Sequence, residues 1–102
     1  RIDLMAILDI VKKALLIPLS ESFADDELNT HIGSCKAYLT SCGINPSYIN
    51  DESNPMVSTV IIIYVKTFFG FKNDGSAKEL PKAFDMLVGQ IALTQGVSEN
   101  VS

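Results

Sequence analysis

Apolar residues recur every three or four positions near the start of this chain, a spacing that predicts an amphipathic helix. The helix spans about residues 3–16 and ends before Pro18, because the residue that precedes a proline is pushed out of helical conformation. Its apolar stripe consists of Leu4, Leu8, Val11 and Leu15.

A second amphipathic helix is predicted over about residues 23–42. Ser22 with Asp25 resembles a capping box, and the acidic run over 25–27 complements the positive end of the helix dipole. Gly43 closes the helix, since glycine readily adopts the left-handed conformation that ends helices. The apolar stripe is Leu28, Ile32, Cys35, Leu39 and Cys42.

The third predicted helix, which begins at Asn54, is apolar on nearly all sides. Asn54 can cap its first turn, Pro55 suits the first helical position, and Gly70 can end it. Lys66 is its one charged residue. Residues 60–65 alone would also suit a buried strand, but the capped ends and the length favour a helix. A helix of this character must be covered on most sides, by its own domain or by neighbouring subunits.

The fourth predicted helix spans about residues 77–94. Ser76 with Glu79 forms a capping box, and Pro81 is tolerated in the first turn. We expect the polar tail over 95–102 to be loose. The apolar face is Leu80, Phe84, Leu87, Val88 and Ile91.

These segments predict an all-α fold, a compact bundle of about four helices in a single domain over residues 1–102. Residues 1–4 precede Met5, the one plausible start codon, and are candidates for vector-derived residues. The turn-rich linkers are residues 18–21, 43–53 and 71–75.

Composition and charge narrow the function. The chain is 47% hydrophobic and carries a net charge of −4, with Arg1 as its one arginine. Because nucleic-acid readers depend on arginine, tight DNA binding is disfavoured. The third helix falls short of the ~18 apolar residues of a membrane span, and charges interrupt the apolar N-terminal stretch that resembles a signal peptide. We therefore expect a cytoplasmic protein without membrane attachment.

Candidate reactive groups are few, and each has a structural interpretation. Cys35 and Cys42 lie ~10 Å apart along one helix, too far to pair, and are expected to be buried thiols. His31 has no companion ligand for zinc, so we expect it to be structural. The acidic run over 25–27 is explained by the helix dipole, and residues 72–75 form a turn that lacks most calcium ligands. We expect no catalytic site, cofactor or metal, and so no enzyme.

Four stretches carry a family resemblance, none of them a catalytic signature. The most specific is the third helix with its aromatic end. The stretches are residues 7–15, 25–44, 60–71 and 80–94. In this order and spacing the chain resembles the head–tail connector, or adaptor, proteins of long-tailed bacteriophages, also described as DNA-packaging proteins. It departs from the family pattern near Gly75, where a proline is often found.

The resemblance implies a structural virion component at the head–tail junction, assembled in the bacterial cytoplasm or encoded by a prophage. It implies a homo-oligomeric ring of about twelve copies beneath the portal protein, with a stopper or tail-completion protein below. DNA would pass through the ring without sequence-specific binding. An acidic wall suits this passage, because like charge prevents adhesion of the polyanion.

A ring requires two different contact patches on each subunit. On the third helix, Ile62, Lys66 and Phe69 lie outside the main apolar arc and share a side with Ser58 and Thr59. This mixed face is the candidate subunit interface. The alternative is that the first or fourth helix covers it within one subunit.

Two other classes of function stay open from the sequence. Four short helices can contain a DNA-binding helix-turn-helix, against which the scarcity of arginine argues. A small regulatory bundle that binds a partner helix is the other. Steep salt dependence of DNA affinity would favour the first class, and a stable monomer with one defined non-viral partner the second.

Overall fold

The computed structural model describes residues 6–51, 54–69 and 79–101, with side chains in the last range as far as 94. Within these ranges the chain forms five α-helices and no strand, which confirms the all-α bundle. The helices are α1 (Ile7–Ala14), α2 (Asp25–Ser41), α3 (Pro46–Ile49), α4 (Pro55–Phe68) and α5 (Lys82–Val101).

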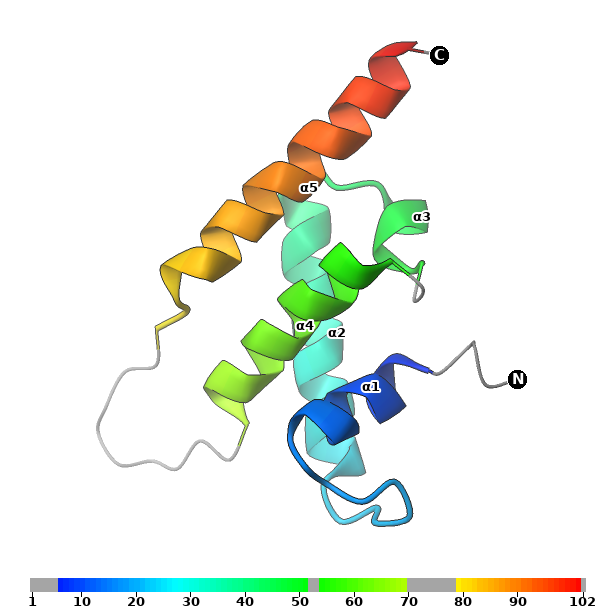
Figure 1. Ribbon diagram of the computed structural model, residues 1–102, viewed down its shortest axis with the longest axis vertical. Coiled ribbons are helices and arrows are strands. Elements are labelled where there is room, and N and C mark those ends of the chain that lie inside the picture. Colours follow the sequence, from blue (N-terminus) through cyan, green and yellow to red (C-terminus); the bar gives the residue numbers. More distant parts are fainter. Residues whose placement is uncertain (1–5, 52–53, 70–78, 102) are drawn as a thin grey trace.

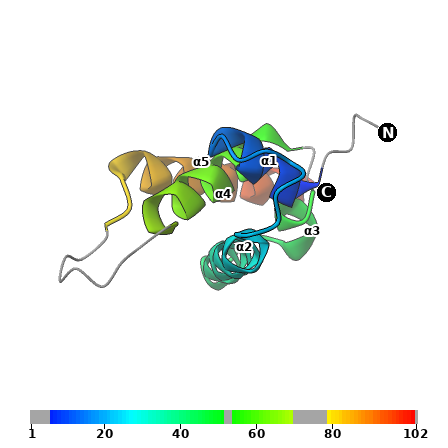
Figure 2. The ribbon, with the colours of Figure 1, turned by 90° about the horizontal axis from the view of Figure 1, so that it is seen from below.

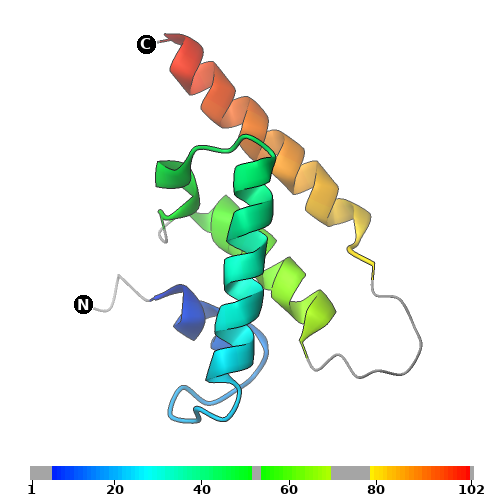
Figure 3. The same cartoon turned by 180° about the vertical axis from the view of Figure 1, so that it is seen from behind.

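The helices form a flat body of 45 × 39 × 18 Å (Figure 1). α1, α4 and α5 lie in one layer with α4 in the middle, and α2 crosses behind them (Figures 2 and 3). α4 contacts α1, α2 and α5. The third predicted helix is therefore the centre of the fold, and its apolar character follows from cover by three neighbours.

α4 begins as the sequence predicts. The Asn54 side chain accepts hydrogen bonds from the backbone N–H groups of Met56 (2.9 Å) and Val57 (3.4 Å), and Pro55 occupies the first helical turn. The helix ends at Phe68, and Gly70, its predicted terminator, lies outside the described residues. Its core-facing residues are Val57, Val60, Ile61 and Val65.

The first predicted capping box is wrong. α2 begins at Asp25 after Ala24, whose side chain has no atom that could accept a cap hydrogen bond, and the Asp25 carboxylate pairs with Lys12. Of the second box, Ser76 lies outside the described residues, Glu79 is outside any helix, and α5 begins only after Pro81. A proline disfavours helical conformation in the residue before it, here Leu80, so the helix starts after Pro81.

The predicted end of the last helix is also too early. The backbone stays helical from Lys82 to Val101, where we expected a loose tail from Gln95. No proline follows Pro81, and Gly96 costs a helix only about 1 kcal/mol relative to alanine, so nothing in the sequence forces the helix to stop. The described part of the predicted tail thus extends α5.

One helix, α3, lies in a stretch predicted to be a linker. The Asn45 carboxamide accepts hydrogen bonds from the Ser47 N–H (2.9 Å) and hydroxyl (2.8 Å), and Pro46 follows at the first helical position. The helix buries Ile49 in the core, 2% exposed. Its start signal, Asn-Pro, is the same as that of α4.

α1 and α2 end in the same hydrogen-bond pattern, the Schellman motif. After α2, Gly43 (φ 91°) donates to the carbonyl of Thr40 at 3.0 Å, and Ile44 donates to that of Leu39 at 3.2 Å. After α1, a leucine takes the place of the glycine: Leu16 has φ 63°. The corresponding bonds are Leu16 N–H to Lys13 O, 3.1 Å, and Ile17 N–H to Lys12 O, 2.8 Å.

Candidate assembly surfaces

The mixed face of α4 (Ser58, Thr59, Ile62, Lys66 and Phe69) is partly open. Thr59 and Lys66 are exposed, on the side away from the buried residues of the helix. Ile62 and Phe69 are half-buried, because they pack against the domain's own core. The bundle thus half-covers Ile62 and Phe69 and leaves Thr59 and Lys66 accessible, and the assignment of this face to a subunit interface stays a prediction.

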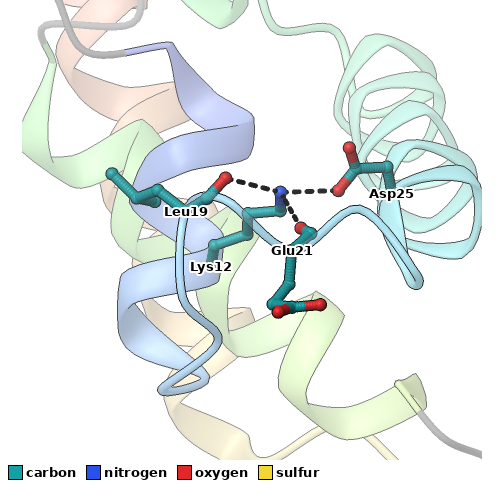
Figure 4. A network of polar contacts seen from close by, with 4 residues as sticks. All are labelled: Lys12, Leu19, Glu21 and Asp25. Carbon is teal, nitrogen blue, oxygen red and sulfur yellow. Dashed lines mark hydrogen bonds and ion pairs between the residues drawn. The ribbon is translucent and has the colours of Figure 1, made fainter.

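A buried lysine organises the loop between α1 and α2, residues 15–24 (Figure 4). Lys12 is 3% exposed. Its Nζ lies 2.7 Å from an Asp25 carboxylate oxygen and donates to the backbone carbonyls of Glu21 (2.6 Å) and Leu19 (3.4 Å). A buried ammonium is tolerated only when it is paired and hydrogen-bonded, and Lys12 has one ion-pair partner and two backbone acceptors. The ion pair joins α1 to the first residue of α2, and the carbonyl bonds fix the loop between them.

The loop that Lys12 holds presents large apolar side chains to solvent. Leu16, Leu19 and Phe23 are 90%, 44% and 74% exposed. In the same loop Ile17 and Ala24 are buried, so the chain has an inner and an outer side here. Exposed apolar side chains are common singly, but three in one short, braced segment indicate an interaction surface.

A second exposed apolar surface lies on α5. Phe84, Val88 and Ile91 face the core, while Met86 and Leu93 are 68% and 71% exposed. The latter two are seven residues apart and share one side of the helix. Gly89 lies between them, and a Cβ atom placed there would meet no atom within 4 Å. We call Met86, Gly89 and Leu93 the outer face of α5.

The remaining candidate reactive groups have structural surroundings. Burial raises the pKa of the Cys35 thiol to about 12, which keeps it protonated and inert. Cys42 is exposed, against our expectation, because it caps the last turn of α2 beyond the covered part of that helix. Neither cysteine is in a disulfide. His31 lies 3.3 Å from the Glu27 carboxylate and 6.3 Å, between ring centroids, from Phe68.

The acidic run at the start of α2 does not act as one unit. Asp25 turns inward to Lys12, Asp26 is exposed, and Glu27 contacts His31. No group of three potential metal ligands occurs among the described residues. Sequence reasoning missed the part played by Lys12, because two of its three partners are backbone carbonyls, which leave no mark in the sequence.

Comparison with known proteins gives one family. Residues 7–98 match the family described as phage connector protein. No curated protein and no solved structure matches the chain. Within the described residues, none of the helices has the length and apolar character needed to cross a bilayer.

Proposed function

The chain belongs to the phage connector protein family, a family of structural phage components, and from this we propose that it is an adaptor subunit of the head–tail junction. Copies of the chain form a ring beneath the portal protein, and a stopper or tail-completion protein binds below. The ring has about twelve members, a closed cyclic assembly of the kind that head-to-tail contacts generate. It resides in the virion after assembly in the bacterial cytoplasm, encoded by a phage or a prophage.

One observation carries this proposal beyond family membership: the subunit exposes two unlike apolar surfaces. The α1–α2 loop presents Leu16 and Phe23, and the outer face of α5 presents Met86 and Leu93. A ring needs two different patches on each subunit, whereas a twofold dimer uses the same patch twice. The presence of two unlike apolar surfaces supports the proposed ring.

The charge of the chain supports a place beside DNA without binding to it. The net charge is −4, and exposed carboxylates include Asp26 and Asp85. Repeated around a ring, this charge repels the DNA backbone and lets the duplex pass without adhesion. The adaptor therefore acts as a passive part of the DNA channel, with no catalytic step.

The experiment that tests the proposal is size-exclusion chromatography with light scattering, over a range of protein concentrations and with the portal protein of the same phage added. We expect a multi-subunit species, alone at high concentration or on the portal. A chain that stays monomeric under all these conditions and never binds the portal would refute the proposal.

The mixed face of α4 is proposed as a third contact surface of the assembled subunit, besides the α1–α2 loop and the outer face of α5. Lys66 is the best probe, because its side chain is exposed while Ile62 and Phe69 also serve the core. Lys66→Glu is expected to leave the fold intact and weaken assembly through charge reversal at the contact. Ile62→Asp is the stronger change. Unfolding by Ile62→Asp, with normal assembly of Lys66→Glu, would assign this face to the subunit's own core.

A further inference from the structure

We infer that neighbouring subunits of the ring join by placing the α1–α2 loop of one copy on the outer face of α5 of the next, with Phe23 seated over Gly89. This inference rests on the proposed ring and names its contact. The loop of each copy thus binds α5 of one neighbouring copy, and its own α5 binds the loop of another neighbouring copy.

On the loop side of this contact, exposed apolar side chains project from a backbone that hydrogen bonds hold in place. Phe23 is 74% exposed and Leu16 is 90% exposed, so most of each side chain is open to solvent. Lys12 holds the backbone beneath them through the carbonyls of Leu19 and Glu21 (Figure 4). A braced loop loses little conformational entropy on binding, which favours association.

The α5 side has the shape that receives such side chains. A glycine in the middle of a helix is unfavourable by about 1 kcal/mol relative to alanine. Gly89 gains nothing in return within the subunit, because an added Cβ would meet no atom within 4 Å. On a helix, position 89 lies between 86 and 93, so Gly89 makes a notch with Met86 and Leu93 as its walls. An aromatic ring from outside fits such a notch.

The exposed charges beside the two apolar surfaces are acidic at the loop and of both signs on α5, where Lys82 and Asp85 lie near Met86. Glu21 and Asp26, both exposed, lie within or beside the loop. Lys82, also exposed, precedes Met86 by one helical turn on the same side of α5. In Figure 4 the Glu21 side chain points away from Lys12, so its carboxylate is available to another cation. Opposite charges at the rim set the register of an apolar contact.

The two surfaces lie on different sides of the flat subunit. In Figure 1 the α1–α2 loop is at the lower edge, below α1, whereas α5 runs along the opposite upper side. The view from behind in Figure 3 shows the same separation. One copy can therefore use both surfaces at once, each with a different neighbour, as a head-to-tail ring requires.

The test uses two variants of the full chain, Phe23→Ser and Gly89→Leu, in the presence of the portal protein of the same phage. Each variant disables one surface and keeps the other. We expect each alone to assemble at least tenfold more weakly than the wild type, measured by light scattering. Gly33→Leu is the matched control, because Gly33 is an exposed glycine in the middle of α2 with equally open surroundings.

Mixing the two variants tests the pairing itself. The intact loop of Gly89→Leu can bind the intact α5 of Phe23→Ser, but the resulting pair has no further matching surfaces. We expect a heterodimer that does not grow into a ring. In addition, the charge exchange Glu21→Lys with Lys82→Glu in one chain is expected to restore assembly that either change alone weakens.

The outcomes separate this inference from the proposed function. If the wild type assembles and both variants assemble equally well, the loop–α5 contact is wrong and the adaptor ring stands. If the wild type never assembles, the ring itself is refuted. If Gly33→Leu weakens assembly as much as Gly89→Leu, the notch has no special part and the inference is overturned. Circular dichroism of each variant establishes that it is folded.

Discussion

The ends of α1 and α2 share one hydrogen-bond motif but differ in the residue that makes the sharp turn. At α2 this residue is Gly43, with φ 91°, the residue type for which such a conformation is easiest. At α1 it is Leu16, with φ 63°. For a residue with a side chain, left-handed backbone costs roughly 1–2 kcal/mol. The backbone at the end of α1 is therefore strained, and the backbone at the end of α2 is relaxed.

The difference between these ends indicates what each is for. The glycine end continues inward, because Ile44 follows at 2% exposure and packs into the core. The leucine end also continues inward, because Ile17 follows at 8% exposure, but the Leu16 side chain itself stays 90% exposed. Strained backbone tends to occur at functional sites. Both ends therefore bury the residue after the turn, and the end of α1 in addition presents an apolar side chain to solvent.

Removal of Lys12 should have the largest effect on stability, because this lysine holds the loop that follows the strained end of α1. Lys12→Met leaves the Asp25 carboxylate and the Glu21 carbonyl without their cation. We expect the free energy of unfolding to fall by about 3 kcal/mol, at the lower end of the range for breaking a buried ion pair, since Asp25 is partly exposed. Urea unfolding followed by circular dichroism measures this change.

Lys13→Met is the control for this change, because Lys13 is the exposed neighbour of Lys12. Its effect on the free energy of unfolding should stay within about 0.5 kcal/mol. Equal losses from both substitutions would show that charge near the end of α1, and not the buried network, stabilises the loop.

Replacement of Gly43 at the end of α2 by leucine, the residue found at the end of α1, should lower the free energy of unfolding by less than the loss of Lys12 does. Gly43→Leu places a side chain at φ 91° and is expected to lower the free energy of unfolding by about 1–2 kcal/mol. An added Cβ meets no atom within 4 Å, so the loss reports backbone strain and not a clash. Gly33→Ala, at a helical position with open surroundings, should instead stabilise the chain by about 1 kcal/mol. A neutral Gly43→Leu would mean that this turn can shift.

The starts of α3 and α4 can be compared in the same way as the ends of α1 and α2, because both begin with an Asn-Pro pair. Asn54→Ala should lower the free energy of unfolding by about 1 kcal/mol, through loss of the bonds to the Met56 and Val57 N–H groups. Asn45→Ala should cost less, because α3 has only 4 residues to lose. Thermal unfolding of the two variants ranks them. A larger loss from Asn45→Ala would make α3 a more important part of the core than its length indicates.

These helix ends also show how far the sequence could be read. The helical class and the start of α4 were predictable, because Asn54-Pro55 stands before a long apolar run. The same pair at Asn45-Pro46 was overlooked, since only one short turn with a single buried residue, Ile49, follows it. The last helix begins at Lys82, later than the predicted start near residue 77, because Pro81 restricts the backbone of the residue before it.

The candidate surfaces were harder to predict than the helices. The mixed face of α4 came from helical periodicity, which places residues on a side but does not say how far neighbouring helices reach over it. Hence the sequence left open how far Ile62 and Phe69 are covered, and in the structure both are half-buried. The left-handed conformation of Leu16 had no sequence signal, since leucine is among the residues least expected there.

The substitution with the smallest expected effect on stability, Leu16→Gly, tests most directly whether Leu16 serves assembly. Leu16→Gly should raise the free energy of unfolding by about 0.5 kcal/mol, because relief of left-handed strain slightly exceeds the added entropy of the unfolded chain. The same change should weaken assembly, because it removes an apolar side chain from the loop. Leu16→Asn, which also tolerates this backbone, should behave similarly. Urea unfolding and light scattering on the same samples separate the two effects. A loss of stability of about 1 kcal/mol or more would make Leu16 a structural residue and remove the argument that its strain serves the contact between subunits.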